Sequence, residues 1–174
     1  MDKQFLLLVQ RHVANVAISP STLRGQGPAG VVEAAQHFLG NLDLGRFRDG
    51  KSDGFRSELD QVAEELRQSL ASGGQHWGAA RKALNIFLRD ALYNTYLRDA
   101  YRVDRLEPWL ELPLDSYTAK AVRKYAPKSE LPRWVGVKYV TADSNAAYQA
   151  AAAGVASEKG VARVHLDIHF WRGE

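Results

Sequence analysis

The chain has 174 residues, of which 45% are hydrophobic and 25% are charged. This fits one compact domain with a core large enough to need no metal or disulfide. The absence of cysteine excludes a disulfide scaffold, a thiolate zinc site, an iron–sulfur cluster and a cysteine nucleophile. The formal net charge of +3 is too small for a protein that coats nucleic acid through charge alone.

Positive charge is concentrated in the middle of the chain. Residues 76–140 carry 12 Lys and Arg against 7 Asp and Glu, whereas residues 1–75 carry 8 against 9 and residues 141–174 carry 3 against 4. A local excess of this kind is typical of an anion-binding surface. Helical surfaces are also rich in Lys and Arg for solvation alone, so both interpretations stay open at this point.

The apolar run near the start of the chain does not predict a targeting segment. Residues 5–9 are fewer than the roughly 7–15 apolar residues of a signal peptide or the roughly 20 of a membrane helix. We expect this run to form the buried face of a first helix in a cytoplasmic protein without membrane association.

Helical periodicity dominates the rest of the sequence, and no run of strict alternation predicts a strand. Further helices are predicted at about residues 29–39, 55–70, 77–101, 116–125 and 145–158, followed by a terminal element at 161–171. Residues 134–140 are β-branched and aromatic and could make a short strand, but in a helical context we prefer a short helix or loop. The sequence therefore predicts a single all-α domain over residues 1–174.

A glycine-bearing turn precedes the longest predicted helix and makes residues 72–82 a candidate hairpin. Gly73 and Gly74 would expose backbone N–H groups at the start of that helix, where unpaired donors and the helix dipole favour a phosphate. Arg81 and Lys82 would add positive charge. The alternative is that this is only a turn between two helices.

A second candidate feature is Asp115, which follows Pro113 at the start of a predicted helix. Capping alone explains an aspartate at this position and contributes about 1 kcal/mol. A carboxylate at a helix N-terminus is also held ionised. Asp115 is therefore a candidate general base or a group that stabilises a cation.

Residues 77–88 and 112–116, with the loop 21–27 and the helix 29–39, resemble a group of small bacterial proteins of 8-oxoguanine DNA glycosylase-like fold. The resemblance covers nearly the whole chain. More distantly, the sequence is similar to the helix-hairpin-helix DNA glycosylases. The resemblance implies a compact helical fold of that type, with Lys82 as the nucleophile and Asp115 as the catalytic carboxylate.

The implied reaction is the excision of an oxidised or otherwise modified base. The amine of Lys82 attacks C1′ of the sugar as the base leaves, and the resulting Schiff base permits strand cleavage. The amine must be neutral, so burial or a cationic neighbour such as Arg81 has to lower its pKa. Asp115 would stabilise the charge that develops on the sugar.

The resemblance also implies a partner and its contacts. The partner is double-stranded DNA with a modified base that enters a pocket with aromatic walls, and Trp109 and Tyr117 are the pocket candidates. The candidate DNA-binding residues are Gly74, His76, Trp77, Gly78 and Arg81. We expect a monomer without a cofactor.

Two features depart from the superfamily pattern. The alternating glycines that usually follow a Leu-Pro pair are replaced by residues 76–78, His-Trp-Gly, and 32 residues separate Lys82 from Asp115. Two alternatives stay open: Lys82 is a solvated lysine, and the fold serves a non-catalytic nucleic-acid-binding or protein-binding module.

A third constellation is His165 and His169, which would share one face of a helix and could hold a metal. No glutamate lies between them, and Asp167 would point elsewhere on a helix. A metal-dependent hydrolase that uses these two histidines is the second alternative. The other interpretation places both histidines at the surface while Leu166 and Phe170 pack inward.

Overall fold

Helices account for all regular secondary structure in residues 2–48, 52–126 and 131–172, the part of the chain that this computed structural model describes. The α-helices are α1 (Lys3–Ala17), α2 (Val31–Gly40), α3 (Ser52–Ser69), α4 (Trp77–Tyr93), α5 (Thr95–Tyr101), α6 (Ser116–Tyr125), α7 (Ala142–Lys159) and α8 (Leu166–Arg172). Short 3₁₀ turns are η1 (Leu44–Phe47), η2 (Val103–Leu106), η3 (Val137–Tyr139) and η4 (Arg163–His165). The predicted all-α class is confirmed for these residues, whereas the glycosylase fold and the single domain stay predictions.

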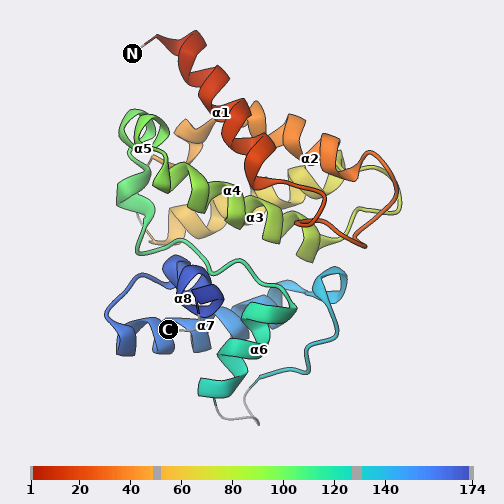
Figure 1. The fold of residues 1–174 in the computed structure, drawn as a ribbon, viewed down its shortest axis with the longest axis vertical. Coiled ribbons are helices and arrows are strands. Elements are labelled where there is room, and N and C mark those ends of the chain that lie inside the picture. Colours follow the sequence, from red (N-terminus) through yellow and green to blue (C-terminus); the bar gives the residue numbers. More distant parts are fainter. Residues whose placement is uncertain (1, 49–51, 127–130, 173–174) are drawn as a thin grey trace.

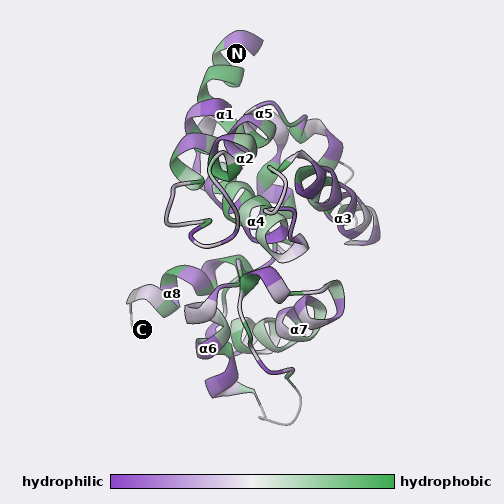
Figure 2. Ribbon diagram, turned by 90° about the vertical axis from the view of Figure 1, so that its right-hand side faces the viewer, coloured by the Kyte–Doolittle hydropathy of each residue, from purple (hydrophilic) through white to green (hydrophobic). Residues whose placement is uncertain are grey.

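The helices form two lobes, one above the other in Figure 1. The N-terminal lobe contains α1 to α5, and the C-terminal lobe contains α6, α7 and α8 (Figures 1 and 2). Residues 107–115, here called the connecting segment, run along the junction from η2 to the start of α6. Within the described residues, no helix is both long and apolar enough to cross a bilayer.

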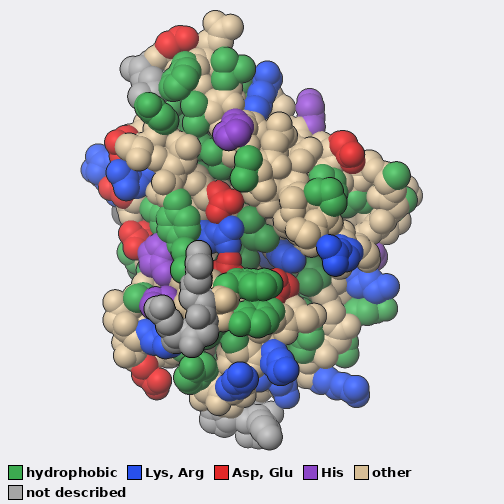
Figure 3. Space-filling model, viewed as in Figure 1, with side chains coloured by type: hydrophobic (Ala, Val, Ile, Leu, Met, Phe, Trp, Pro, Cys, Tyr) green, Lys and Arg blue, Asp and Glu red, His purple; other side chains and the backbone are tan. Residues whose placement is uncertain are grey.

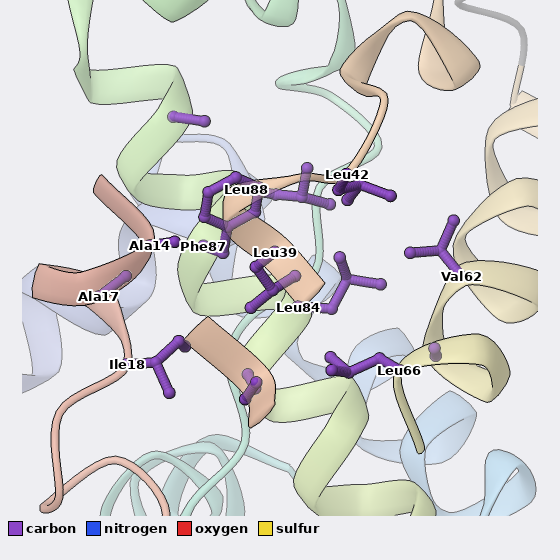
Figure 4. Close-up of a cluster of buried hydrophobic side chains, with 14 of the residues drawn as sticks. Ala14, Ala17, Ile18, Leu39, Leu42, Val62, Leu66, Leu84, Phe87 and Leu88 are labelled. Atoms are coloured by element: carbon purple, nitrogen blue, oxygen red, sulfur yellow. The ribbon is translucent and has the colours of Figure 1, made fainter. Parts of the chain in front are cut away.

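Helix α4 lies at the centre of the N-terminal lobe. It packs against α1, α2, α3 and α5, and its predicted apolar face is buried at Leu84, Phe87 and Leu88 (Figure 4). The predicted stripe of α3 is also buried throughout: Phe55, Leu59, Val62, Leu66 and Leu70. Burial of each large apolar side chain stabilises the fold by about 1.5–3 kcal/mol. Helix α4 is therefore a firmly held platform for any group that it carries.

The C-terminal lobe has a hydrophobic cluster of its own. Tyr148 of α7 and Leu112 of the connecting segment are fully enclosed there. Trp134 packs against both clusters, while Val137 and Val164 belong to the N-terminal cluster. The lobes are therefore joined by shared apolar contacts at their junction as well as by the chain.

The apolar run 5–9 does not form one buried face, which corrects the expectation for the first helix. Phe5 and Leu8 are 43% and 58% exposed, and α1 instead buries Leu6, Gln10 and Val13. The reason is that successive residues of a helix point in different directions. The amide of Gln10 donates hydrogen bonds to the carbonyls of Leu39 and Leu42 at 2.9 and 2.7 Å.

The helix expected over residues 77–101 is divided at Asn94. That residue has an extended conformation, and its side chain accepts a hydrogen bond from the N–H of Leu97 at 3.1 Å. Asparagine competes with the helical backbone in this way and favours a new N-terminus. Residues 137–139 form η3, so the preference for a short helix over a strand in that region is confirmed.

Candidate active site at the lobe junction

Lys82 lies in the second turn of α4 and reaches the start of the C-terminal lobe. Its Nζ donates a hydrogen bond to the carbonyl of Thr22 at 2.9 Å and lies 3.9 Å from Oδ2 of Asp115. Only 11% of the side chain is exposed. The alternative of a solvated surface lysine is therefore wrong, and the predicted nucleophile and carboxylate face each other.

Asp115 caps α6 and faces Lys82 at the same time. Its Oδ1 accepts hydrogen bonds from the N–H groups of Tyr117 and Thr118, both at 2.9 Å, which leaves Oδ2 directed toward the amine. Thr118 completes a capping box, because its Oγ1 accepts from the N–H of Asp115 and donates to the carbonyl of Pro113. These bonds fix the carboxylate in one orientation.

A second carboxylate, Asp167 of α8, belongs to the same site and was not predicted. Its side chain is 10% exposed and forms an ion pair with Arg89 of α4. Trp171, one turn later on α8, also gives it a hydrogen bond. Asp167 does not join His165 or His169, in line with the expectation that it points elsewhere on a helix. No sequence spacing relates this residue to Lys82.

The electrostatics of the site favour a lysine that can lose its proton. Burial lowers the pKa of Lys82, while the charges of Asp115 and Asp167 oppose that shift. Burial raises the pKa of Asp167, against the opposing charge of Arg89. Desolvation, and not the Arg81 charge, is therefore what lowers the lysine pKa.

Tyr117 and Trp171 form an aromatic wall next to the two carboxylates, because Tyr117 follows Asp115 on α6 and Trp171 follows Asp167 on α8. Their rings stack with centroids 4.5 Å apart and planes at 22°, and the hydroxyl of Tyr117 donates to the carbonyl of Phe170. Trp109 instead lines a different hollow of about 650 Å³ beside Arg81 and Glu111. The prediction that Trp109 and Tyr117 share a pocket is therefore wrong, and Trp171 is the aromatic partner of Tyr117.

Residues 134–140, here called the rim segment, bridge the starts of α4 and α6. Trp134 Nε1 donates to Oγ of Ser116 at 3.1 Å. At the other end, a Cβ on Gly78 would overlap the carbonyl oxygen of Val137 and lie 2.7 Å from Cβ of Val140. Gly78 is thus required for close packing and is covered, which corrects its prediction as a phosphate contact.

Arg81 is buried in an ion-pair network and is not a DNA contact. Its guanidinium pairs with Asp60 at 2.7 Å and with Glu111 at 2.8 and 3.0 Å. Asn85 and Asn145 donate to the same Glu111 carboxylate. Burial alone would raise the pKa of Glu111, but Arg81, the amide of Asn85 and the charge of Arg163 lower it overall. With its donors committed in this way, Arg81 links α4 to the connecting segment.

The predicted hairpin is packed against the loop before α2. Gly74 donates its N–H to the carbonyl of Ala71 at 2.8 Å, and a Cβ on it would lie 2.5 Å from Cγ2 of Val31. Gly74 is therefore not an open phosphate cradle. His76 and Trp77 remain half-buried, and the ring of Trp77 lies 5.3 Å from the guanidinium carbon of Arg81.

The two histidines of the metal alternative do not form a joint site. Both ring nitrogens of His165 are engaged, by the Tyr93 hydroxyl at 2.8 Å and the Glu107 carboxylate at 2.7 Å. His169 borders a separate hollow on α6 and α8. Among residues 2–48, 52–126 and 131–172, no group of three His, Asp or Glu side chains is placed to hold a metal ion. We therefore do not retain the metal-dependent hydrolase.

Comparison with protein-family models, with curated proteins and with solved structures found no match to this chain. A function must therefore be argued from the site itself. Its elements are an enclosed lysine, two carboxylates and an aromatic wall at the junction of two helical lobes.

Proposed function

We propose that the protein is a DNA glycosylase with lyase activity that uses Lys82 as its nucleophile and Asp115 as its catalytic carboxylate. One observation carries the proposal: the desolvated Nζ of Lys82 lies 3.9 Å from a carboxylate whose other oxygen is fixed by a helix N-terminus. A buried lysine beside a fixed carboxylate is a group whose protonation state is tuned for chemistry.

In the proposed reaction, the neutral Nζ forms a bond to C1′ of the sugar while the bond from C1′ to the base breaks. The base leaves with the electron pair and takes up a proton. Opening of the sugar ring then gives a Schiff base between Nζ and C1′, and loss of a C2′ proton expels the 3′ phosphate. Asp115 stabilises the positive charge on the sugar and accepts the proton that Nζ releases.

The base would be held by the aromatic wall beside Lys82. Trp171 exposes 61% of its surface, so an extruded base can stack on it. Asp167 lies one turn before Trp171 on α8 and is kept in place by Arg89. Its carboxylate accepts hydrogen bonds, so it would favour a base with N–H donors at its edge.

The test is covalent trapping with borohydride on two duplexes, one with an abasic site and one with 8-oxoguanine opposite cytosine. The wild-type protein should give a reduced adduct with at least the abasic duplex. The Lys82→Gln variant should give none, and Asp115→Asn should form the adduct at least tenfold more slowly. Lys138→Gln, which alters an exposed lysine of the rim segment, is the control and should trap normally.

The absence of an adduct from folded wild-type protein on every duplex would contradict the proposal. DNA binding that is unchanged in Lys82→Gln and Asp115→Asn, without any trapping by the wild type, would instead support the non-catalytic binding module.

A further inference from the structure

We propose that a basic and aromatic pocket on α6 and α8 binds the phosphodiester backbone of the DNA strand next to the Lys82 site. The inference rests on the proposed function, because it takes the substrate strand as its ligand. It replaces the α3–α4 turn as the phosphate contact, since Gly74, Gly78 and Arg81 are committed to internal packing and pairing.

The pocket has a volume of about 260 Å³. It is lined by Tyr117, Lys120, Ala121, Lys124, Tyr125, His169 and Phe170. Lys120 and Lys124 are exposed and lie one turn apart on the same face of α6. The exposed rings of Tyr117 and Tyr125 flank the two lysines along α6. Cations and aromatic rings around one groove are typical of surfaces that track a nucleic-acid backbone.

Among the described residues, these two lysines have no carboxylate partner, in contrast to the six arginines that form ion pairs. Arginines that form ion pairs in the described residues are Arg46, Arg67, Arg81, Arg89, Arg98 and Arg102. Neither Lys120 nor Lys124 has an ion pair within the described part of the chain. Lys and Arg side chains gather on the lower part of the face shown in Figure 3, over the C-terminal lobe. Uncompensated charge of this kind favours binding of a polyanion.

The pocket shares Tyr117 with the aromatic wall of the candidate active site. Tyr117 lines the pocket and also stacks on Trp171 in the wall beside Lys82. Lys120 and Lys124 follow Asp115 by five and nine residues, so they lie about 7 and about 13 Å further along the α6 axis. One strand of DNA has a phosphate about every 3.4 Å of duplex axis. The two lysines are therefore spaced to meet phosphates a few nucleotides from the reacting sugar.

The experiment measures the affinity of the full chain for a duplex with a tetrahydrofuran abasic analogue, which cannot be cleaved, between about 50 and about 200 mM salt. Lys120→Gln and Lys124→Gln should each lower the slope of log affinity against log salt by about 0.9, and the double variant by about 1.8. Lys3→Gln, which alters an exposed lysine at the far end of α1, is the control and should leave the slope unchanged.

Slopes in both α6 variants that equal the wild-type slope would overturn the inference. An equal decrease of the slope in Lys3→Gln and in the α6 variants would overturn it as well, because the decrease would then reflect the net charge of the protein and not these two positions. Wild-type trapping is scored separately. If the wild type is trapped but the salt slopes of the α6 variants are unchanged, only this inference is overturned. If the salt slopes of these variants are reduced but the wild type is not trapped, the DNA-binding surface is supported and the glycosylase proposal is contradicted.

Discussion

Arg81 and Lys82 are neighbours on α4, and both reach across the junction of the two lobes, but their surroundings differ. Arg81 is bonded at 2.7–3.0 Å to two carboxylates, one of which also receives two asparagine amides. Lys82 has one backbone carbonyl at 2.9 Å and a carboxylate only at 3.9 Å. The comparison distinguishes a cation that holds the fold together from one that is left available for chemistry.

The difference lies in how completely each buried charge is compensated. A buried ion pair whose donors and acceptors are all bonded resists change, and removal of one partner leaves an uncompensated charge. The Lys82 amine is desolvated and only partly compensated, which lowers its pKa. Natural proteins accept such incomplete compensation where function needs a reactive group.

The largest effect should come from Arg81→Met. This variant leaves Glu111 buried without its cation, and we expect a loss of about 3–5 kcal/mol in the free energy of unfolding, measured by urea denaturation. Arg67→Met, which removes a half-exposed ion pair with Glu64, is the control and should change stability much less. Adding Glu111→Gln to Arg81→Met should recover most of the loss. A small loss in the free energy of unfolding of Arg81→Met would contradict the structural role that distinguishes Arg81 from Lys82.

Gly78→Ala should have the next largest effect. The added methyl group overlaps the Val137 carbonyl, so the rim segment must move away from α4 at a cost of about 1–3 kcal/mol. Gly154→Ala is the control, because that glycine lies on α7 with no atom near its Cβ position, and it should be stabilising by about 0.4–1 kcal/mol. Thermal unfolding of both variants measures the difference. Equal melting temperatures would contradict the close packing of the rim segment on α4.

Thr118→Val should cost about 1 kcal/mol, because it removes the capping-box hydroxyl that fixes Asp115. We also expect slower borohydride trapping, since the backbone of Asp115 loses its hydroxyl partner and its carboxylate, now held by two backbone N–H groups alone, is less firmly oriented. Thr141→Val breaks the matching capping box of α7 and should cost a similar amount of stability without affecting trapping. Equal trapping rates in the two variants would show that the orientation of Asp115 is unimportant.

The smallest effect concerns the dependence of stability on pH. The pKa of Lys82 in the folded protein lies below its ordinary value of 10.5. Between these two pH values, Lys82 therefore binds more protons in the unfolded chain than in the folded chain. Stability from this residue should therefore rise with pH across that window, and Lys82→Met should abolish the rise. Asp115→Asn should lower the pKa of folded Lys82 further, because the Asp115 charge raises it. The rise in stability should then begin at a lower pH. Denaturation curves across this pH range test both signs, and a rise that persists in Lys82→Met would contradict the assignment.

Local patterns predicted the features that depend on neighbours in the sequence. The apolar stripe of α3 and the capping role of Asp115 are examples, and both are confirmed. The pairing of Lys82 with Asp115 was expected only from a family resemblance, because no local pattern relates residues so far apart. Asn94 was missed because an apolar pattern continues across it, although a helix-capping side chain was the available signal.

Long-range contacts explain the remaining differences. Asp167 joins the site from the last helix, and the carbonyl of Thr22 joins it from a loop 60 residues before Lys82. Arg81 was predicted to be an accessible cation because a single sequence does not reveal that Glu111 and Asp60 neutralise it. Residue type and spacing suggested which groups are reactive, but the compensation of each charge depends on the tertiary structure.

The most direct test of the central claim is to locate the reduced adduct within the chain. Wild-type protein would be trapped with borohydride on an abasic duplex, digested, and analysed by mass spectrometry for the residue that carries the sugar remnant. We predict that the remnant is attached to Nζ of Lys82. Attachment to another lysine or to the N-terminal amine would contradict it.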